Sequence, residues 1–168
     1  MTNLEATRTR TVSWEDPTET VQIGKTISGI EYLRALQAGE LPSPPFAVLM
    51  GIWMTEVSEG RVVFAAEPGE YHYNPLGTVH GGVMATLLDS ALGCAVQSLL
   101  PAGTSYTTLE LKVNYLRPVT TKTGMVYAEG KIIHLGGRIA TAEARLTDAA
   151  GKLYAHGTTT CIILRPHQ

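Results

Sequence analysis

The sequence predicts an α+β domain in which a largely antiparallel β-sheet curls around one long, buried helix. Three observations lead to this prediction: an apolar segment of helical composition at residues 81–100, two β-patterned runs before it, and four β-patterned runs after it. Turn residues at short spacing join the strands, as expected for antiparallel neighbours. A chain of 168 residues is long enough for one domain with a substantial core.

Residues 1–45 are expected to form a polar leader with one short amphipathic helix, and residues 46–168 the domain proper. The first 25 residues show no apolar pattern and are expected to be loosely packed. Apolar side chains then recur at helical spacing, from Ile27 to Leu41. Gly39 provides a stop and the prolines at 42, 44 and 45 a break.

The domain is expected to begin with a β-hairpin. The runs 46–57 and 61–67 are β-rich, and Ser58-Glu59-Gly60 between them is a turn signal. The segment 81–100 is then predicted as a helix by its length and its Ala, Leu and Met content. Apolar residues cover nearly its whole circumference, which is typical of a buried helix.

Four long strands are expected to complete the chain, at residues 105–117, 124–134, 138–147 and 153–164. Their junctions carry Pro118, Gly136-Gly137 and Ala150-Gly151, which are turn residues. Within the third strand, small apolar residues alternate with polar or β-branched ones, so one face is expected to line the core. The inward residues would be Ala140, Ala142, Ala144 and Leu146.

Composition indicates a soluble, globular protein, and we expect it in the cytoplasm. Charged residues make up 17% and apolar residues 44% of the chain, which is too apolar for disorder. No apolar run approaches the roughly 18–20 residues of a membrane span, and the polar N-terminus lacks the apolar segment of a secretory signal. Cys94 and Cys161 have no CxxC partner and are expected to be buried thiols.

Charge is distributed unevenly along the chain. Residues 1–84 carry five basic and ten acidic side chains, a net charge of −5, whereas residues 85–168 carry eight and five, a net charge of +3. Either an acidic leader precedes a neutral domain, or the C-terminal half binds something anionic. Nucleic acid is disfavoured as that partner, because the whole chain has a net charge of −2 and no basic aromatic motif.

Asp89 is the residue that most clearly indicates chemistry. It lies in the middle of the apolar segment, where desolvating a carboxylate costs several kcal/mol unless hydrogen bonds or a charge compensate. It is either a structural acid, partnered or on a face open to solvent, or a functional carboxylate in a cleft or subunit interface.

Gly81 and Gly82 begin the same helix. Free N–H groups at a helix start can stabilise an oxyanion, and glycine lets a substrate approach the backbone. The alternative is that the two glycines only permit a tight turn. Asp89 lies eight residues beyond Gly81, about two helical turns along one side. Oxyanion donors and a carboxylate on one helix would suit acyl transfer, although the pattern alone is not specific.

The segment 74–93, NPLGTVHGGVMATLLDSALG, resembles the signature of hot-dog-fold acyl-CoA thioesterases of the phenylacetic-acid-degradation type. The segments TLELKVNYLRPV, HLGGRIATAEARL and GKLYAHGTTT follow in the order of that family. The resemblance covers about residues 46–164 and leaves 1–45 outside. It implies an enzyme that hydrolyses an acyl-CoA to free acid and coenzyme A.

The resemblance implies a role for each matched residue. Asn74 and the Gly81 N–H would polarise the thioester carbonyl and stabilise the tetrahedral oxyanion. Asp89 would act as general base on water or as nucleophile. Thr108 would orient the attacking water. His80 would position the loop and the thioester, or it is a structural histidine that caps the helix start.

Coenzyme A would be the anionic ligand. The residues that the resemblance implies for binding it are Gly82, Arg117, Pro118, His134, Gly136, Gly137 and Arg138. Arginine suits bidentate contact with phosphate, although either arginine could instead be a solvated surface charge.

No metal or prosthetic group is expected, because the five histidines, including His167, form no ligand cluster in the sequence. The resemblance implies a homodimer whose sheets join edge to edge, paired again into a tetramer. Asn74 and Gly81 of one chain would face Asp89 and Thr108 of the other, which would explain an aspartate on an apolar helix.

Two other functions stay open. A hot-dog dehydratase acting on 3-hydroxyacyl thioesters shares the fold, and an acyl-CoA-binding sensor could keep the pocket without turnover. The acyl group is open too: an aromatic group such as phenylacetyl and a medium-chain aliphatic group are both admissible. Candidate residues to line its pocket are Tyr71, Tyr73, Met84 and Leu88.

Overall fold

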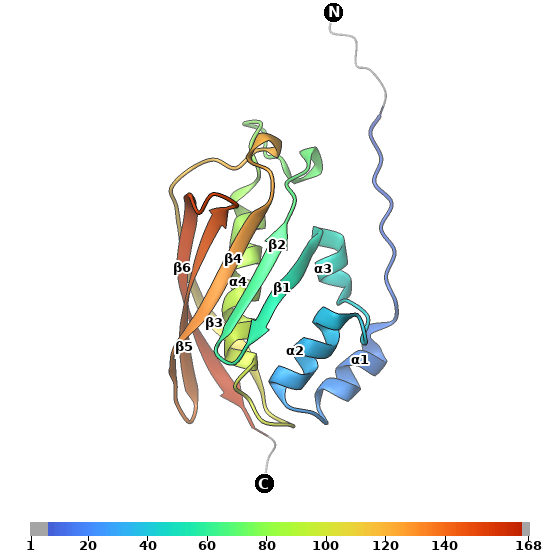
Figure 1. Cartoon of the computed structure of the whole chain (residues 1–168), viewed down its shortest axis with the longest axis vertical. Helices are drawn as coiled ribbons and strands as arrows, with labels where there is room; N and C mark the ends of the chain where they lie inside the picture. The colour runs from blue at the N-terminus through green and yellow to red at the C-terminus, as the bar shows by residue number, and fades with distance from the viewer. Residues whose placement is uncertain (1–6, 166–168) are drawn as a thin grey trace, which may run out of the picture.

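The computed structural model describes residues 7–165, and in that part of the chain a six-stranded sheet encloses helix α4 (Gly81–Gln97) (Figure 1). The strand order is β1-β2-β4-β5-β6-β3, and all neighbouring strands are antiparallel. Their bounds are β1 (Ile52–Ser58), β2 (Arg61–Ala66), β3 (Ser105–Tyr115), β4 (Val126–Leu135), β5 (Ile139–Asp148) and β6 (Leu153–Leu164). His167 lies outside the described residues, as do residues 1–6.

The predicted fold class is confirmed. The last four strands begin and end within two residues of their predicted bounds, and the hairpin between β1 and β2 turns at Gly60, whose φ is 73°. The alternation in β5 is confirmed as well, because its small apolar residues are all buried in the core. Short 3₁₀ helices at Glu70–His72 and Thr121–Thr123 complete the loops at one end of the sheet.

Helix α4 can approach the sheet closely because the strands beneath it carry small residues. A side-chain Cβ at Gly130 of β4 would collide with the carbonyl oxygen of Ala91 in the helix. Around this contact, several inward-facing positions of β4, β5 and β6 are alanines that are fully or nearly buried: Ala128, Ala142, Ala144 and Ala155. The helix therefore rests on the sheet with its backbone at Gly130, and larger apolar residues fill the space to either side.

The N-terminal part of the chain contains more helix than the sequence predicts. Residues Pro17–Gly24, expected to be unpatterned, form α1; Asp16 caps it by accepting a hydrogen bond from the Thr18 N–H at 2.8 Å. The run that begins at Phe46, expected as a strand, starts with helix α3 (Pro45–Met50). Two prolines preset the start of this helix, and Gly51, with φ of 66°, ends it so that the strand begins only at Ile52.

Helix α2 (Gly29–Ala38) is the amphipathic helix that the sequence predicts. Ser28 and Glu31 form a capping box at its start, and Gly39 ends it with φ of 75°. The helix is fixed to the domain by the Gly29 N–H, which donates to Leu100 O at 2.9 Å, and by Gln37, which donates to Thr55 O at 2.8 Å.

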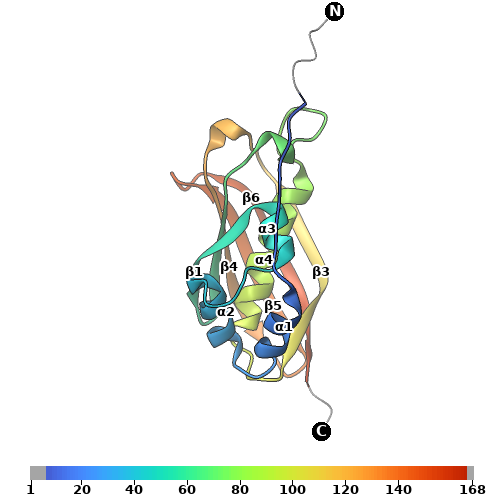
Figure 2. The same ribbon diagram turned by 90° about the vertical axis from the view of Figure 1, so that its right-hand side faces the viewer.

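The three N-terminal helices lie across α4 on the side that the sheet leaves open, between the edge strands β1 and β3 (Figure 2). Arg10 ties the preceding extended segment to this layer, since its guanidinium donates to Leu49 O at 2.7 Å and lies over the Tyr71 ring. The predicted division between residues 45 and 46 stays a prediction. Among the described helices, none has the length and apolarity needed to cross a bilayer.

Replacing Gly130 with alanine should lower the free energy of unfolding by about 1–3 kcal/mol, the usual cost of overpacking a core. The new methyl group would meet the helix backbone, which cannot move aside as a side chain can. Urea denaturation measures the change. Gly137→Ala is the matched control, because a Cβ there meets nothing within 4 Å. Equal stabilities for the two variants would contradict the close approach.

Candidate functional site

The predicted site residues lie at three places in one chain. Asn74, Gly81, Arg117 and Pro118 surround a shallow cavity of about 350 Å³ at the start of α4. Asp89 and Thr108 meet halfway along α4 and β3. The third group occupies the β4–β5 turn and comprises His134, Gly136, Gly137 and Arg138.

Asp89 is a half-buried carboxylate with one hydroxyl partner. The Thr108 Oγ1 donates a hydrogen bond to Asp89 Oδ1 at 3.1 Å. Directly after Thr108 the register of β3 against β6 shifts, so that Leu109 bulges out and is 57% exposed. A bulge re-aims the side chains beside it, and here it lies next to the threonine that holds the carboxylate.

The start of α4 leaves one backbone donor free. His80 caps the helix: its Nδ1 accepts from the Gly82 N–H at 2.9 Å, and its carbonyl oxygen accepts from the Val83 N–H. Among residues 7–165 the Gly81 N–H has no acceptor. The structure thus gives His80 the role of a helix cap and occupies the Gly82 N–H, whereas the Gly81 N–H remains available to a ligand.

Asn74 is oriented by its own turn. Its Oδ1 accepts from the Leu76 N–H at 2.9 Å and its Nδ2 donates to Thr78 Oγ1 at 3.1 Å. An amide nitrogen carries two hydrogens, so one is left for a ligand. The contacts also show that Asn74 stabilises the loop.

Within one chain these groups are too far apart to act on one substrate atom. Gly81 and Asp89 are separated by eight residues of continuous helix, which is about 12 Å. Along β6, seven residues separate Ala155, which pairs with Tyr115 near Arg117, from Ile162, which pairs with Ile139 beside Arg138. At 3.4 Å per residue, the two predicted coenzyme A arginines lie at opposite ends of the sheet, about 24 Å apart.

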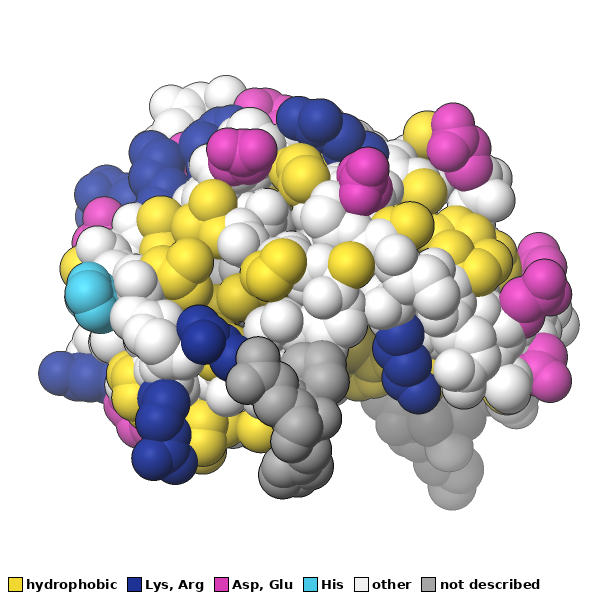
Figure 3. Space-filling view, turned by 90° about the horizontal axis from the view of Figure 1, so that it is seen from below, with side chains coloured by type: hydrophobic (Ala, Val, Ile, Leu, Met, Phe, Trp, Pro, Cys, Tyr) yellow, Lys and Arg dark blue, Asp and Glu magenta, His cyan; other side chains and the backbone are white. Residues whose placement is uncertain are grey.

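Both arginines are exposed. Arg117 is anchored by its Nη1, which donates to Leu153 O at 2.6 Å, and Arg138 follows Gly137, whose surroundings are open. Figure 3 views the molecule from the end that holds the β4–β5 turn. Basic side chains are more frequent there on the side of β5 and β6, and acidic ones on the side of the N-terminal helices. The charge asymmetry of the sequence is therefore also an asymmetry of this surface.

Sequence reasoning missed Tyr115, which packs on Gly81 and donates through its hydroxyl to Gly81 O at 3.0 Å. Nothing in a β-patterned run distinguishes this tyrosine from a core residue. The four residues expected to line an acyl pocket do not share one cavity within this chain. Leu88 is fully buried in the core, Tyr71 is exposed beneath Arg10, and of the four only Met84 lines the shallow cavity.

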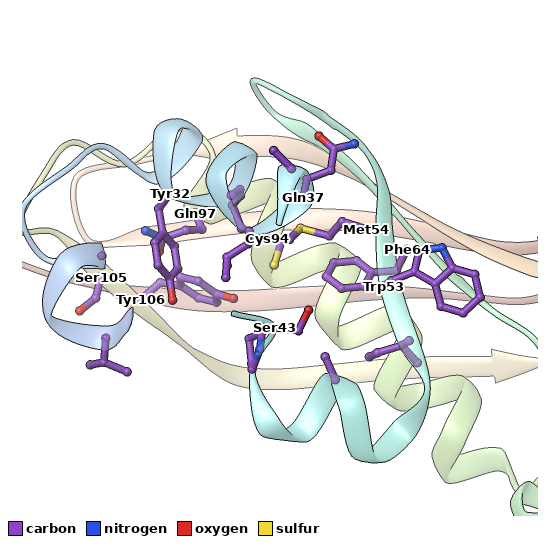
Figure 4. A pocket seen from close by; sticks show the side chains of 18 of the residues that line it. Tyr32, Gln37, Ser43, Trp53, Met54, Phe64, Cys94, Gln97, Ser105 and Tyr106 are labelled. Atoms are coloured by element: carbon purple, nitrogen blue, oxygen red, sulfur yellow. The ribbon is translucent and has the colours of Figure 1, made fainter. Parts of the chain in front are cut away.

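A larger cavity, of about 720 Å³, lies elsewhere, between the N-terminal helices and the domain (Figure 4). None of the four expected residues lines it. Cys94, expected to be buried, lies deep in the molecule but is partly accessible because its side chain faces this cavity, whereas Cys161 is buried as predicted. No group of three or more His, Cys, Asp or Glu side chains that could hold a metal occurs in the described part of the chain.

A six-stranded antiparallel sheet that encloses one long helix is the hot-dog fold. The Thioesterase superfamily model matches residues 76–155. The human acyl-coenzyme A thioesterase 13 is 30% identical over 118 residues, which cover 67% of this chain and 80% of that protein. The chain belongs to the thioesterase superfamily, and it is a thioester hydrolase.

Further relatives agree with this assignment. A protein of Halobacterium salinarum is 35% identical over 97 residues, which are 56% of this chain and 58% of that relative's length. A solved structure of a phenylacetic acid degradation-related protein from Ralstonia eutropha JMP134 is 28% identical, with a TM-score of 0.71, and the match covers 78% of this chain and 98% of that one. The family resemblance inferred from residues 74–93 is confirmed.

The loop that carries Asn74 is held by a buried histidine, which makes its stability sensitive to pH. His72 is 6% exposed; its Nε2 donates to Met50 O at 3.0 Å, and its Nδ1 accepts from the Gly69 N–H at 3.1 Å. Burial lowers the pKa of His72 below its usual 6.5, and the charge of Arg10 adds to the effect. The neutral ring is therefore the form that fits the fold.

Below about pH 6.5 the unfolded chain binds a proton at His72 more readily than the folded chain does. The contribution of the neutral His72 ring to the free energy of unfolding is thus complete above that pH and is lost as the pH falls. Melting temperatures between pH 7.5 and about 5.5 should fall more steeply for the wild type than for His72→Gln. The exposed His134 offers the control His134→Gln, which should keep the wild-type slope; equal slopes for all three proteins would contradict the role of His72.

Proposed function

We propose that this protein hydrolyses acyl-CoA thioesters, with Asp89 as general base or nucleophile and without a metal or prosthetic group. The observation that carries the proposal is the hydrogen bond from Thr108 to the half-buried Asp89. A hydroxyl that donates to one carboxylate oxygen orients the group and leaves the other oxygen for water or for the thioester. The named acyl-CoA thioesterase among the relatives supports coenzyme A as the carrier.

In the general-base route, Asp89 removes a proton from water as the water oxygen bonds to the thioester carbonyl carbon. The Gly81 N–H and the free Asn74 amide hydrogen stabilise the tetrahedral oxyanion. Collapse of that intermediate breaks the C–S bond, and the leaving thiolate takes the proton from Asp89. In the nucleophilic route, Asp89 itself attacks the carbonyl carbon, the C–S bond breaks and coenzyme A leaves as the thiolate. Water then hydrolyses the resulting anhydride, which regenerates the Asp89 carboxylate, releases the free acid and supplies the proton that the thiolate takes up.

The proposed site is completed by a second copy of the chain. The support for this proposal is the distance of about 12 Å between Gly81 and Asp89 along the helix of one protomer. At that distance the Gly81 N–H and the Asp89 carboxylate of one chain cannot act on the same thioester carbonyl. Strand β3 is an edge strand of the described sheet. Two-fold pairing of β3 with its copy would reverse the direction of the second protomer. Asn74 and Gly81 of one chain would then face Asp89 and Thr108 of the other.

The same two-fold pairing would bring Arg117 of one chain toward the β4–β5 turn of its partner. Arg117, Pro118, His134, Gly136, Gly137 and Arg138 are proposed to hold the phosphates and pantetheine of coenzyme A. A further pairing of dimers into a tetramer, and a cytoplasmic location, remain part of the proposal.

Asp89→Asn keeps the shape of the side chain and removes its basicity, so release of free thiol from an acyl-CoA panel should fall by about 10²–10⁴-fold. Asp16→Asn is the control, because asparagine caps a helix as well as aspartate does. Thermal unfolding shows whether each variant is folded. Near-normal turnover in folded Asp89→Asn would remove Asp89 from the mechanism.

The same assay on the wild type separates the alternative functions. Free thiol supports hydrolysis, an enoyl thioester without free thiol would indicate a dehydratase, and binding without any turnover would indicate a sensor.

Arg138→Ala should raise KM for acyl-CoA about tenfold or more, the scale of a hydrogen bond to a charged group, and change KM for the matching acyl-pantetheine much less. Pantetheine lacks the nucleotide phosphates that the guanidinium would bind. Arg145→Ala, another exposed arginine on β5, is the control and should leave both values unchanged. Equal changes for both esters in Arg138→Ala would discredit the phosphate role.

A further inference from the structure

The cavity of about 720 Å³ beneath the N-terminal helices is closed by residues outside the segment that matches the family model. Its walls come from α1, α2, α3, β1 and β2 on one side and from α4 and β3 on the other. In the view of Figure 4, Tyr32 and Tyr106 lie at one end, Trp53 and Phe64 at the other, and Cys94 between them. The N-terminal helices and the hot-dog domain are both needed to form the cavity, so these helices act as its roof.

The cavity begins close to the proposed catalytic carboxylate. Cys94 follows Asp89 by five residues on α4, a rise of about 7.5 Å. Tyr106 precedes Thr108 by two residues on β3, so both side chains point to the same face of the strand. A Cβ at Gly93 would collide with the Tyr106 hydroxyl, which places this tyrosine one helical turn beyond Asp89. Tyr106, which lines the cavity and shares a strand face with Thr108, thus places one end of the cavity near the carboxylate.

The lining is suited to an uncharged, apolar ligand. Aromatic and aliphatic side chains dominate it, no acidic side chain contributes, and Lys25 is its one charged residue among those described. The thiol and phenol nearest Asp89 stay neutral: burial raises the pKa of Cys94 to about 12 and that of Tyr106 well above its usual range, and the Asp89 charge adds to both shifts.

The volume indicates a large group. Pockets of about 300–1,000 Å³ hold whole drug-sized ligands, whereas only the acyl part of an acyl-CoA would enter here, because the nucleotide must remain with the exposed arginines. At about 720 Å³, the cavity has room for much more than a phenylacetyl group.

We propose that this cavity is the acyl-chain site and that its roof of N-terminal helices selects extended aliphatic acyl groups of medium to long chain over short or single-ring ones. The inference rests on the proposed function, since it places the thioester carbonyl at Asp89 and the tail beyond Tyr106. Specificity for the acyl group then belongs to residues 17–51, and the hydrolytic chemistry to the remainder of the chain.

The first test is the dependence of kcat/KM on acyl length, from butyryl-CoA upward. Each methylene that enters the cavity should raise kcat/KM about fourfold, the equivalent of about 0.8 kcal/mol, until the cavity is filled. Phenylacetyl-CoA should be a poor substrate. A flat profile, or a maximum at butyryl-CoA or phenylacetyl-CoA, would overturn the proposal.

Two filling variants locate the effect in the cavity. Ala47→Phe, on the inner side of α3, should lower kcat/KM for the best long-chain ester at least tenfold and leave butyryl-CoA within about twofold. Ser43→Phe, at an exposed position that also lines the cavity, provides the same test with less risk to folding. Leu49→Phe, on the exposed side of α3 and outside the cavity lining, is the matched control. An unchanged profile in both folded filling variants would overturn the proposal.

A binding measurement separates failure of this inference from failure of the proposed function. Trp53 lines the cavity, and Trp14 is the other tryptophan of the chain. In a Trp14→Phe background, dodecanoate brominated at its terminal carbon should quench Trp53 emission, and Ala47→Phe should weaken the quenching. Quenching without thiol release would sink the hydrolase and keep the acyl site. Thiol release with neither quenching nor chain-length preference would sink the acyl site and keep the hydrolase.

Discussion

The contact between the backbone of α4 and Gly130 of β4 is the constraint on which the rest of this structure depends. Because the helix rests directly on the strand, the sheet can curl around it and bury most of a long apolar segment. The sheet leaves the helix open between its edge strands β1 and β3. Asp89 contacts the edge strand β3, and the end of the helix faces the N-terminal layer.

The part of α4 that faces β3 and the N-terminal helices therefore carries both the candidate carboxylate and a wall of the apolar cavity. A carboxylate is tolerable there because Thr108 donates to it and because the side chain is only half-buried. Further along the helix, Cys94 and Gln97 contribute to the wall of a cavity that α2 and α3 close. Chemistry and recognition of the acyl group would thus share one helix, with different elements placed over each part.

Much of this could be predicted from the sequence, for reasons that particular residues illustrate. The composition of residues 81–97 and the alternation at Ala140, Ala142 and Ala144 are local signals of burial, and they fixed the helix and the strands. The run after Phe46 failed as a prediction because its apolar residues fit either a strand or a helix. The backbone geometry at the two ends of this run favours a helix, with Pro44 and Pro45 at its start and Gly51 at its end.

The sequence by itself determined the fold class and the family, and it singled out Asp89, Gly81 and Asn74 as candidate site residues, because each is a matter of local pattern and spacing. Only the tertiary structure decided which backbone donor is free, since the His80 side chain occupies the Gly82 N–H and leaves that of Gly81. It also decided that Arg117 and Arg138 lie at opposite ends of the sheet, and that a cavity exists beneath the N-terminal helices. Distances across strands and spaces between layers arise from packing between segments far apart in the chain, which no local pattern records.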